Sequence, residues 1–236
     1  MGGSDRAASD FDRLVAFNRE QLQAHARERF RAGGGTQPSV TRVVTGEAEA
    51  VFKDYADSAW LMRWFAPLFV YREASALQRL AGVEGIPRVY RRVDGRGILI
   101  EYLPAPKWSR SQPTPSAHER LERLLADVHA RGVAHGDLRG SGNILLRADG
   151  QPCLVDFVAR VHRGRPWNRP WNAIFRAFCQ ADRNALAKLK LRWAPELATA
   201  EEVRRAEHRG WPARFVRAIG VGVRRLVRLL VRQPER

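Results

Sequence analysis

The chain has 236 residues, with 41 Lys and Arg against 25 Asp and Glu, so its formal net charge is +16 at pH 7. Such a charge favours an anionic partner, whether nucleotide, nucleic acid, anionic lipid or phosphorylated glycan, without choosing among them. No stretch approaches the roughly 20 apolar residues that span a bilayer, and the charged start does not resemble a secretion signal. A chain of this length is expected to form one compact catalytic unit. Cys153 and Cys179 have no metal-ligand spacing, which fits the reducing cytoplasm.

The beginning of the chain predicts a helix and then a hairpin. Apolar residues at helical spacing predict a leading helix within residues 11–30, and three glycines at 33–35 predict a hinge after it. Residues 39–45 and 47–53 are rich in Val and Thr on either side of a glycine. This pattern is typical of a hairpin and puts Lys53 on its second strand.

A second helix and a second hairpin are predicted next. An apolar stripe predicts a helix over residues 69–81, and Pro67 should prevent this helix from starting much earlier. Residues 88–93 and 97–102 flank Asp-Gly-Arg and predict two antiparallel strands. The prolines that follow should end this hairpin.

The middle of the chain predicts a third helix and a short hairpin. Ser116, with a glutamate three residues later, is typical of a capping box and predicts the start of this helix. Residues 143–147 and 151–157 predict two short strands around Asp-Gly. Asn143 and Asp156 would then lie at the ends of one hairpin.

Beyond Trp171 the pattern is mostly helical. In residues 211–232, arginines fall within about a third of a helical wheel and apolar residues lie opposite, with no acidic residue between. This basic amphipathic helix suits the headgroup region of an anionic membrane. A terminal helix that packs on the protein and leaves its basic face in water would give the same pattern.

The most informative pattern is an ordered set of polar residues. His135-Gly136-Asp137-Leu138-Arg139 precedes Asn143-Ile144-Leu145-Leu146, and Val155-Asp156-Phe157 follows. Phosphoryl transfer needs a carboxylate near the attacking hydroxyl and oxygen ligands that hold magnesium on the phosphates. Asp137, Asn143 and Asp156 are side chains of these types.

Together with Lys53, Glu73 and Glu101-Tyr102-Leu103, this ordered set resembles the protein-kinase superfamily over roughly residues 39–160. The resemblance implies an α+β, two-lobed fold with a reduced N-lobe sheet and a truncated, mostly helical C-lobe. We expect four segments: an N-terminal helix and glycine linker at 1–35, the N-lobe at 36–103, the C-lobe at 104–208, and the basic amphipathic helix at 209–236.

The resemblance also implies a role for each residue, with ATP and Mg²⁺ as cofactors. Asp137 would orient the acceptor hydroxyl and accept its proton, and Arg139 would neutralise charge on the transferring group. Asn143 and Asp156 would be the metal ligands. The nucleotide would be bound through Lys53 paired with Glu73, through apolar contacts of Val51, Ile100 and Leu145 with adenine, and through main-chain hydrogen bonds of Glu101 and Leu103.

Each role has a simpler alternative. Asp137 and Asn143 could be turn residues, and Arg139 a solvated loop cation. Lys53 and Glu73 could be surface residues. Ordinary core packing would equally explain the three apolar residues.

Two departures from the superfamily pattern narrow the resemblance. The asparagine lies six residues after Asp137, whereas the usual loop places it five after. Together with Asp182-Arg183-Asn184-Ala185-Leu186, this longer loop is similar to that of bacterial RIO-like kinases and the lipopolysaccharide core kinase family. In addition, no G-x-G-x-x-G precedes Lys53, and we interpret Gly33-Gly34-Gly35-Thr36 as a linker after a helix.

The resemblance therefore predicts an ATP-dependent phosphotransferase that acts on an alcohol, with a sugar hydroxyl of lipopolysaccharide core or a related envelope glycolipid as first choice. A RIO-like serine/threonine protein kinase is the second. An inactive pseudokinase that binds anionic membrane or nucleic acid through its basic surface is a third, although no base-reading motif favours nucleic acid. We expect the protein in the cytoplasm or peripherally on the cytoplasmic face of the inner membrane.

Overall fold

A computed structural model describes residues 3–35, 37–139 and 141–207, which fall into two compact units. We call residues 3–74 with 87–102 the N-terminal unit, and residues 75–86 with 103–207 the C-terminal unit. The class is α+β, as predicted. The basic helix expected within 209–236, including 211–232, lies outside the described residues. No described helix is both long enough and apolar enough to cross a bilayer.

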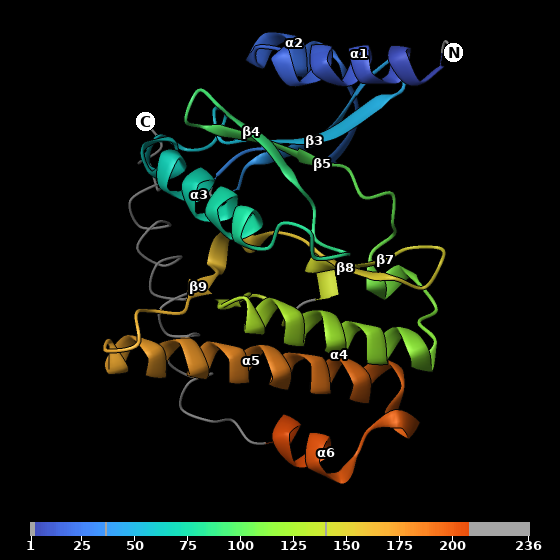
Figure 1. Cartoon of the computed structure of the whole chain (residues 1–236), viewed down its shortest axis with the longest axis vertical. Helices are drawn as coiled ribbons and strands as arrows, with labels where there is room; N and C mark the ends of the chain where they lie inside the picture. Colours follow the sequence, from blue (N-terminus) through green and yellow to red (C-terminus); the bar gives the residue numbers. More distant parts are fainter. Residues whose placement is uncertain (1–2, 36, 140, 208–236) are drawn as a thin grey trace, which may run out of the picture. The chain divides into compact units, whose positions relative to one another are not determined.

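The N-terminal unit is built on one antiparallel sheet with strand order β1-β2-β3-β5-β4 (Figure 1). Buried apolar side chains of α1 and α2, among them Leu14 and Leu22, pack with Phe52 and Leu99 of the sheet. The elements are α1 (Gly3–Ala16), α2 (Arg19–Ala24), β1 (Ala26–Arg31), β2 (Ser39–Thr45), β3 (Ala48–Asp54), α3 (Trp60–Arg79), β4 (Val89–Val93) and β5 (Gly97–Glu101). The residues of α3 after Ala74 belong to the C-terminal unit.

Both predicted hairpins of this unit are confirmed. β2 and β3 pair around Gly46, whose φ of 56° suits glycine, and β4 and β5 pair around Asp94-Gly95. Asp94 and Gly95 both have positive φ, at 47° and 66°. A turn with positive φ at both central residues has the right-handed twist of the antiparallel strands that it joins.

The prediction of one helix within residues 11–30 is wrong in its second half. Asn18 caps α2 through a capping box with Gln21, so a new helix starts there. The ring of His25 then bonds the carbonyl of Gln21 at 2.8 Å, at the point where α2 ends. The following residues form β1, which pairs with β2. The glycines at 33–35 therefore belong to the loop of a hairpin.

The predicted start of the helix at 69 is also wrong. α3 begins at Trp60 and includes Pro67. Proline removes one backbone N–H, which leaves the carbonyl four residues earlier, that of Arg63, without its helical partner. Both residues lie on the exposed side of α3, where water can bind that carbonyl, so the helix continues through the proline.

The C-terminal unit combines helices with two small two-stranded sheets, β6–β9 and β7–β8 (Figure 1). Phe175 and Cys179 of α5 pack against Ala134 and Val161 of the first sheet. The elements are η1 (Trp108–Arg110), α4 (Pro115–Ala130), β6 (Val133–Ala134), η2 (Ser141–Asn143), β7 (Ile144–Leu146), β8 (Pro152–Leu154), η3 (Phe157–Ala159), β9 (Val161–His162), α5 (Arg169–Trp193), η4 (Pro195–Leu197) and α6 (Ala200–Glu207).

α4 has the predicted buried stripe but not the predicted cap. Thr114 is the N-cap, because its hydroxyl accepts the N–H of Ala117 at 3.3 Å, and Pro115 occupies the first turn. Ser116 lies inside the helix and its hydroxyl is 3.0 Å from that of Thr114. The predicted capping box is therefore wrong by two residues.

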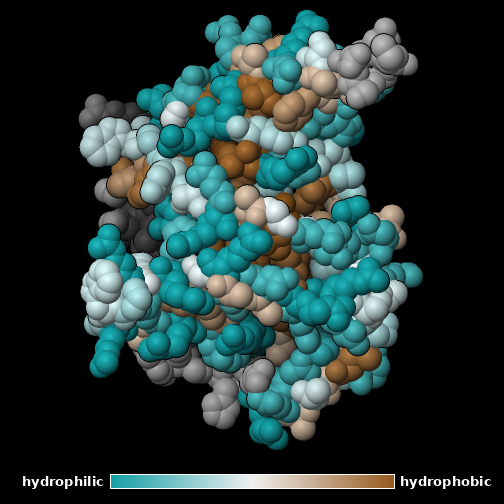
Figure 2. Space-filling model, in the orientation of Figure 1, coloured by the Kyte–Doolittle hydropathy of each residue, from teal (hydrophilic) through white to brown (hydrophobic). Residues whose placement is uncertain are grey.

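The visible surface is mostly hydrophilic (Figure 2). This agrees with a sequence in which 28% of the residues are charged. Hydrophobic side chains interrupt it in a few patches. The exposed large side chains of α3 include Trp60, Trp64 and Tyr71.

Candidate functional site

A buried carboxylate fixes the start of the loop that contains the predicted catalytic residues. Asp182 of α5 is 2% exposed and accepts the backbone N–H groups of His135 at 2.7 Å and Gly136 at 2.9 Å. The ring Nε2 of His129 lies 3.1 Å from the same carboxylate. Three N–H groups can thus satisfy one buried acid, which holds the backbone of this loop in place.

Gly136 is required by this geometry. Its φ is 82°, and a Cβ at this position would lie 2.7 Å from the carbonyl oxygen of Ala159. A larger residue, such as the arginine found here in many protein kinases, would therefore have to move the backbone.

His135 connects the loop to the segment before Asp156. Its ring is fully buried and packs on Phe157, with ring centroids 4.6 Å apart. Nδ1 accepts the backbone N–H of Asp137 at 3.3 Å, so Nε2 bears the proton and donates to the carbonyl of Val155 at 3.0 Å. The histidine is a structural residue that positions two candidate site residues.

Asp137 and Asn143 lie side by side. The amide nitrogen of Asn143 donates to the backbone carbonyl of Asp137 at 2.9 Å and approaches its Oδ2 at 3.3 Å. η2, which ends at Asn143, accommodates the extra residue between them. Asp137 is exposed, so an acceptor could reach its carboxylate.

Asp156 follows β8 in a left-handed conformation, with φ 70° and ψ 65°. Aspartate adopts this conformation more readily than most residues, but it is uncommon and concentrates at functional positions. The backbone N–H of Val155 donates to the carbonyl of Asn143 at 3.0 Å. Asn143 and Asp156 therefore flank the β7–β8 hairpin, as predicted.

These side chains fit a hard cation. Two carboxylates and an amide oxygen are the donors that Mg²⁺ accepts, and Mg²⁺ commonly completes its shell with water and phosphate oxygens. Among the described residues, no group of three or more His, Cys, Asp or Glu is arranged to hold a metal by itself. The amide oxygen of Asn143 and the carboxylate of Asp156 are thus of the types that suit a metal arriving with a nucleotide.

In the N-terminal unit, Lys53 of β3 forms the predicted ion pair with Glu73 of α3. Nζ and Oε1 are 2.5 Å apart, and the two side chains are 8% and 1% exposed. Burial of charges is costly unless they are paired, so neither residue is an ordinary surface charge. The pair holds the lysine side chain in one position.

The predicted adenine contacts divide between the two units. Val51 and Ile100 are buried partners across the β3–β5 ladder. Glu101 ends β5, and its carboxylate accepts the backbone N–H and the guanidinium of Arg88, which raises the pKa of that guanidinium. Leu103 and Leu145 are half-buried residues of the C-terminal unit.

The glycines at 33–35 precede the lysine strand as a hairpin loop, and our interpretation as a linker after a helix is wrong. Gly34 and Gln37 exchange backbone hydrogen bonds of 3.2 and 3.1 Å. Gly34 and Gly35 have φ of 140° and 54°, and no atom lies within 4 Å of a Cβ built on either. Backbone conformation, not lack of space, demands glycine here.

Arg139 is exposed, two positions after Asp137 in the same loop. Within the part of the chain that the structure describes, its guanidinium makes no ion pair or hydrogen bond. The guanidinium remains available to an anion. This agrees both with the predicted role beside the transferring group and with a solvated loop cation.

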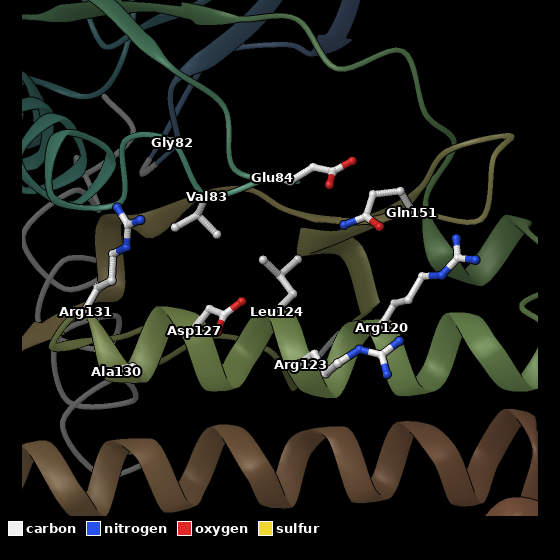
Figure 3. A pocket seen from close by; sticks show the side chains of 10 residues that line it. All are labelled: Gly82, Val83, Glu84, Arg120, Arg123, Leu124, Asp127, Ala130, Arg131 and Gln151. Atoms are coloured by element: carbon white, nitrogen blue, oxygen red, sulfur yellow. The ribbon is translucent and has the colours of Figure 1, made fainter.

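A separate pocket lies in the C-terminal unit, between α4 and the segment Gly82–Glu84 (Figure 3). Its volume is about 510 Å³. Arg131 at one end donates to the carbonyl of Ala81 at 2.6 Å, and Arg120 at the other donates to that of Asp149 at 3.0 Å. None of the predicted site residues lines this pocket.

No family model matches the chain. The Rio2 kinase of Chaetomium thermophilum is similar in structure, with a TM-score of 0.55 and 17% identity over 72% of this chain and 60% of that one. The ADP/Mg²⁺-phosphoaspartate complex of that kinase has a TM-score of 0.57 to this chain and 16% sequence identity. The match covers 80% of this chain and 62% of that one. The fold is protein-kinase-like. The similarity to lipopolysaccharide core kinases stays a prediction.

A Probable SapB synthase of Streptomyces coelicolor is similar in sequence, at 33% identity over 39% of this chain. The chain spans 12% of that protein and less than two thirds of the Rio2 chains. The likeness to the Rio2 structures establishes the fold. Activity, substrate and partners require separate argument.

Proposed function

We propose that the protein is an ATP- and Mg²⁺-dependent phosphotransferase that acts on an alcohol hydroxyl. The observation that supports this most is the arrangement around Asp137: an accessible carboxylate, hydrogen bonded to Asn143, in a loop whose backbone is anchored by buried Asp182. A turn residue would not need this support.

In the proposed reaction, Asp137 orients the acceptor hydroxyl and takes its proton as the oxygen bonds to the γ-phosphorus and the bond to the β–γ bridging oxygen breaks. Arg139 neutralises charge on the transferred group. Asn143 and Asp156 hold magnesium, which when bound neutralises charge on the phosphate oxygens. ADP and the phosphorylated alcohol are the products.

The nucleotide is bound mainly by the N-terminal unit in this proposal. Lys53, held by Glu73, contacts the phosphates, and the glycine loop at 33–35 lets backbone approach them closely. Val51, Ile100 and Leu145 contact the adenine. Glu101 and Leu103 bind its edge through main-chain groups, which leaves the Glu101 side chain free to keep its bonds to Arg88.

The proposed acceptor is a sugar hydroxyl of an envelope glycolipid at the cytoplasmic face of the inner membrane. The net charge of +16 supports an anionic acceptor of this kind. A serine or threonine of a protein is the second candidate, supported by the likeness to Rio2 kinase. Membrane binding through residues 211–232 is a further proposal that rests on sequence alone.

Labelled ATP tests both acceptors with the full-length protein. Incubation with lipid-linked core oligosaccharide, and separately with generic protein substrates, should label the glycolipid in a Mg²⁺-dependent manner. Lys53→Met should abolish the transfer. Label on protein alone would overturn the glycolipid assignment and leave the phosphotransferase in place.

The pseudokinase alternative makes a different prediction. If the protein is only a scaffold, Asp137→Ala should preserve its cellular function, whereas changes that remove the basic surface should abolish it. Loss of function in Asp137→Ala, with normal protein abundance, would favour the enzyme.

A further inference from the structure

α3 has an aromatic stripe that the core does not use. Its exposed fractions are 55% for Trp60, 80% for Trp64, 50% for Leu68 and 57% for Tyr71. At about 100° per residue, these four side chains fall within about 80° of the helical wheel, which places them on one side. Phe65, 41% exposed, lies next to them and packs edge-on against Trp64.

The opposite side of α3 already supplies the packing. Met62, Ala66 and Val70 are buried there, together with Glu73 in its ion pair. The stripe is therefore an additional apolar surface, which a protein seldom leaves in water unless a partner covers it. In Figure 2, brown and pale side chains interrupt the hydrophilic surface on the left, where α3 lies in Figure 1.

The exposed and half-buried charges of α3 itself are all positive. Glu73 is the only carboxylate in Trp60–Arg79, and it is buried with Lys53. Arg63 is exposed on one flank of the stripe, and Arg72 is half-buried on the other. An anionic partner matches this pattern, whereas an acidic residue would be expected if the partner were basic.

We propose that α3 inserts this aromatic stripe into the headgroup region of an anionic lipid bilayer. Trp and Tyr favour that region because their rings are apolar while their N–H and O–H groups stay hydrated. Arg63 then meets lipid phosphates. The surface is distinct from residues 211–232, and the proposal does not depend on the phosphotransfer activity.

The geometry favours a bilayer over a protein partner. The stripe is the convex side of a single helix, with Trp64 the most exposed of its side chains. A protein would have to present a matching groove, whereas lipid deforms around a protruding ring. In a second copy of this chain paired antiparallel through the same stripe, the two Arg63 residues would lie on the same flank, and like charges would oppose the contact.

Vesicle flotation of the full-length protein tests the proposal. Wild type should float with vesicles of phosphatidylcholine mixed with phosphatidylglycerol and hardly with phosphatidylcholine alone. Trp64→Ser/Leu68→Ser should lower the partition coefficient about tenfold or more, because two apolar side chains no longer enter the bilayer. Arg63→Glu should also weaken binding while keeping the apolar surface.

Trp167→Ser is the matched control, since Trp167 is 72% exposed but lies in the C-terminal unit. It should float as wild type does. All variants should keep the wild-type thermal midpoint, because the substituted side chains are exposed. Unchanged flotation of Trp64→Ser/Leu68→Ser, or loss of flotation in Trp167→Ser, would overturn the proposal.

Two further measurements distinguish α3 from the C-terminal segment and a bilayer from a protein partner. Full-length Leu226→Asp/Leu230→Asp interrupts the apolar face predicted for residues 211–232. If it abolishes flotation while the α3 variants do not, the C-terminal segment and not α3 is the membrane surface. If sedimentation shows a dimer that the α3 variants dissociate, the stripe is a protein interface and the bilayer proposal fails.

Discussion

At the scale of single residues, Asp182 is the one whose role the sequence did not reveal. Its pattern with Arg183 and Leu186 was visible, but its partners are 46 to 53 residues away. Lys53 and Glu73 were predictable because strand, helix and residue order all agree with the protein-kinase-like pattern. Asp182 has no such local context, so only the fold shows that it anchors the loop.

Asp182→Asn tests this positioning role. An amide keeps the size but offers one acceptor oxygen, so it cannot accept both backbone N–H groups that the carboxylate accepts. We expect kcat to fall by about a hundredfold from misplacement of Asp137, with KM for ATP nearly unchanged. Arg183→Gln, an exposed change at the next position, should retain wild-type kcat. A rise in KM alone would contradict positioning of the catalytic loop.

Cysteine chemistry gives a second prediction at this scale. Burial, with help from the Asp182 carboxylate, raises the pKa of the Cys179 thiol to about 12. Because the folded pKa exceeds the ordinary value of 9.0, this thiol stabilises the fold below pH 9.0 and loses that contribution as the pH rises toward 12. Cys153 is fully buried.

The native protein should therefore react negligibly with a thiol reagent such as DTNB at mildly alkaline pH, and denaturation should release two reactive thiols. Rapid labelling of the folded protein would show that one cysteine is accessible.

At the scale of elements, local turn chemistry decided which predictions succeeded. Gly46 and Asp94-Gly95 mark hairpins that form as expected. β1 is mostly charged and has no strand pattern, and it exists because it pairs with β2. Pro67 is tolerated because it lies on the solvent side of α3. Nonlocal pairing and exposure cannot be extracted from a short window of sequence.

The N-terminus of α4 offers a direct comparison of two hydroxyl residues. Thr114→Ala removes the cap of the Ala117 N–H and should lower the free energy of unfolding by about 1 kcal/mol. Ser116→Ala should lower the free energy of unfolding by no more than a few tenths of a kcal/mol. Urea denaturation of both variants measures the difference, and the reverse order would restore Ser116 as the cap.

α4 should also make the protein sensitive to acid through His118. Burial, together with the charge of nearby Lys190, lowers the pKa of the His118 imidazole below 6.5. The imidazole packs edge-on against the ring of Trp108, with ring centroids 5.0 Å apart. A depressed histidine pKa means that stability is complete above pH 6.5 and declines as the pH falls below it. His118→Gln should reduce this decline in thermal midpoint between neutral and mildly acidic pH. If the thermal midpoint of His118→Gln declines with pH as steeply as that of wild type, other groups cause the decline.

At the scale of the whole molecule, each unit contains part of the predicted residue set. The N-terminal unit contains the Lys53–Glu73 pair, and the C-terminal unit contains the Asp137 loop and Asp156. The sequence predicted these residues, the α+β class and the protein-kinase-like fold, because the motif order is preserved. It could not predict the exposed stripe of α3, since helical extent and burial both depend on tertiary packing.

The central claim is phosphoryl transfer assisted by Asp137. The most direct test compares Mg²⁺-dependent transfer from ATP by wild type, Asp137→Asn and the exposed control Asp127→Asn. Asparagine preserves the bond from Asn143 to the backbone of residue 137 but cannot accept the hydroxyl proton. The account predicts that Asp137→Asn lowers kcat by about 10²- to 10⁴-fold with little change in ATP affinity, while the control stays at wild-type activity. Wild-type kcat in Asp137→Asn would contradict it.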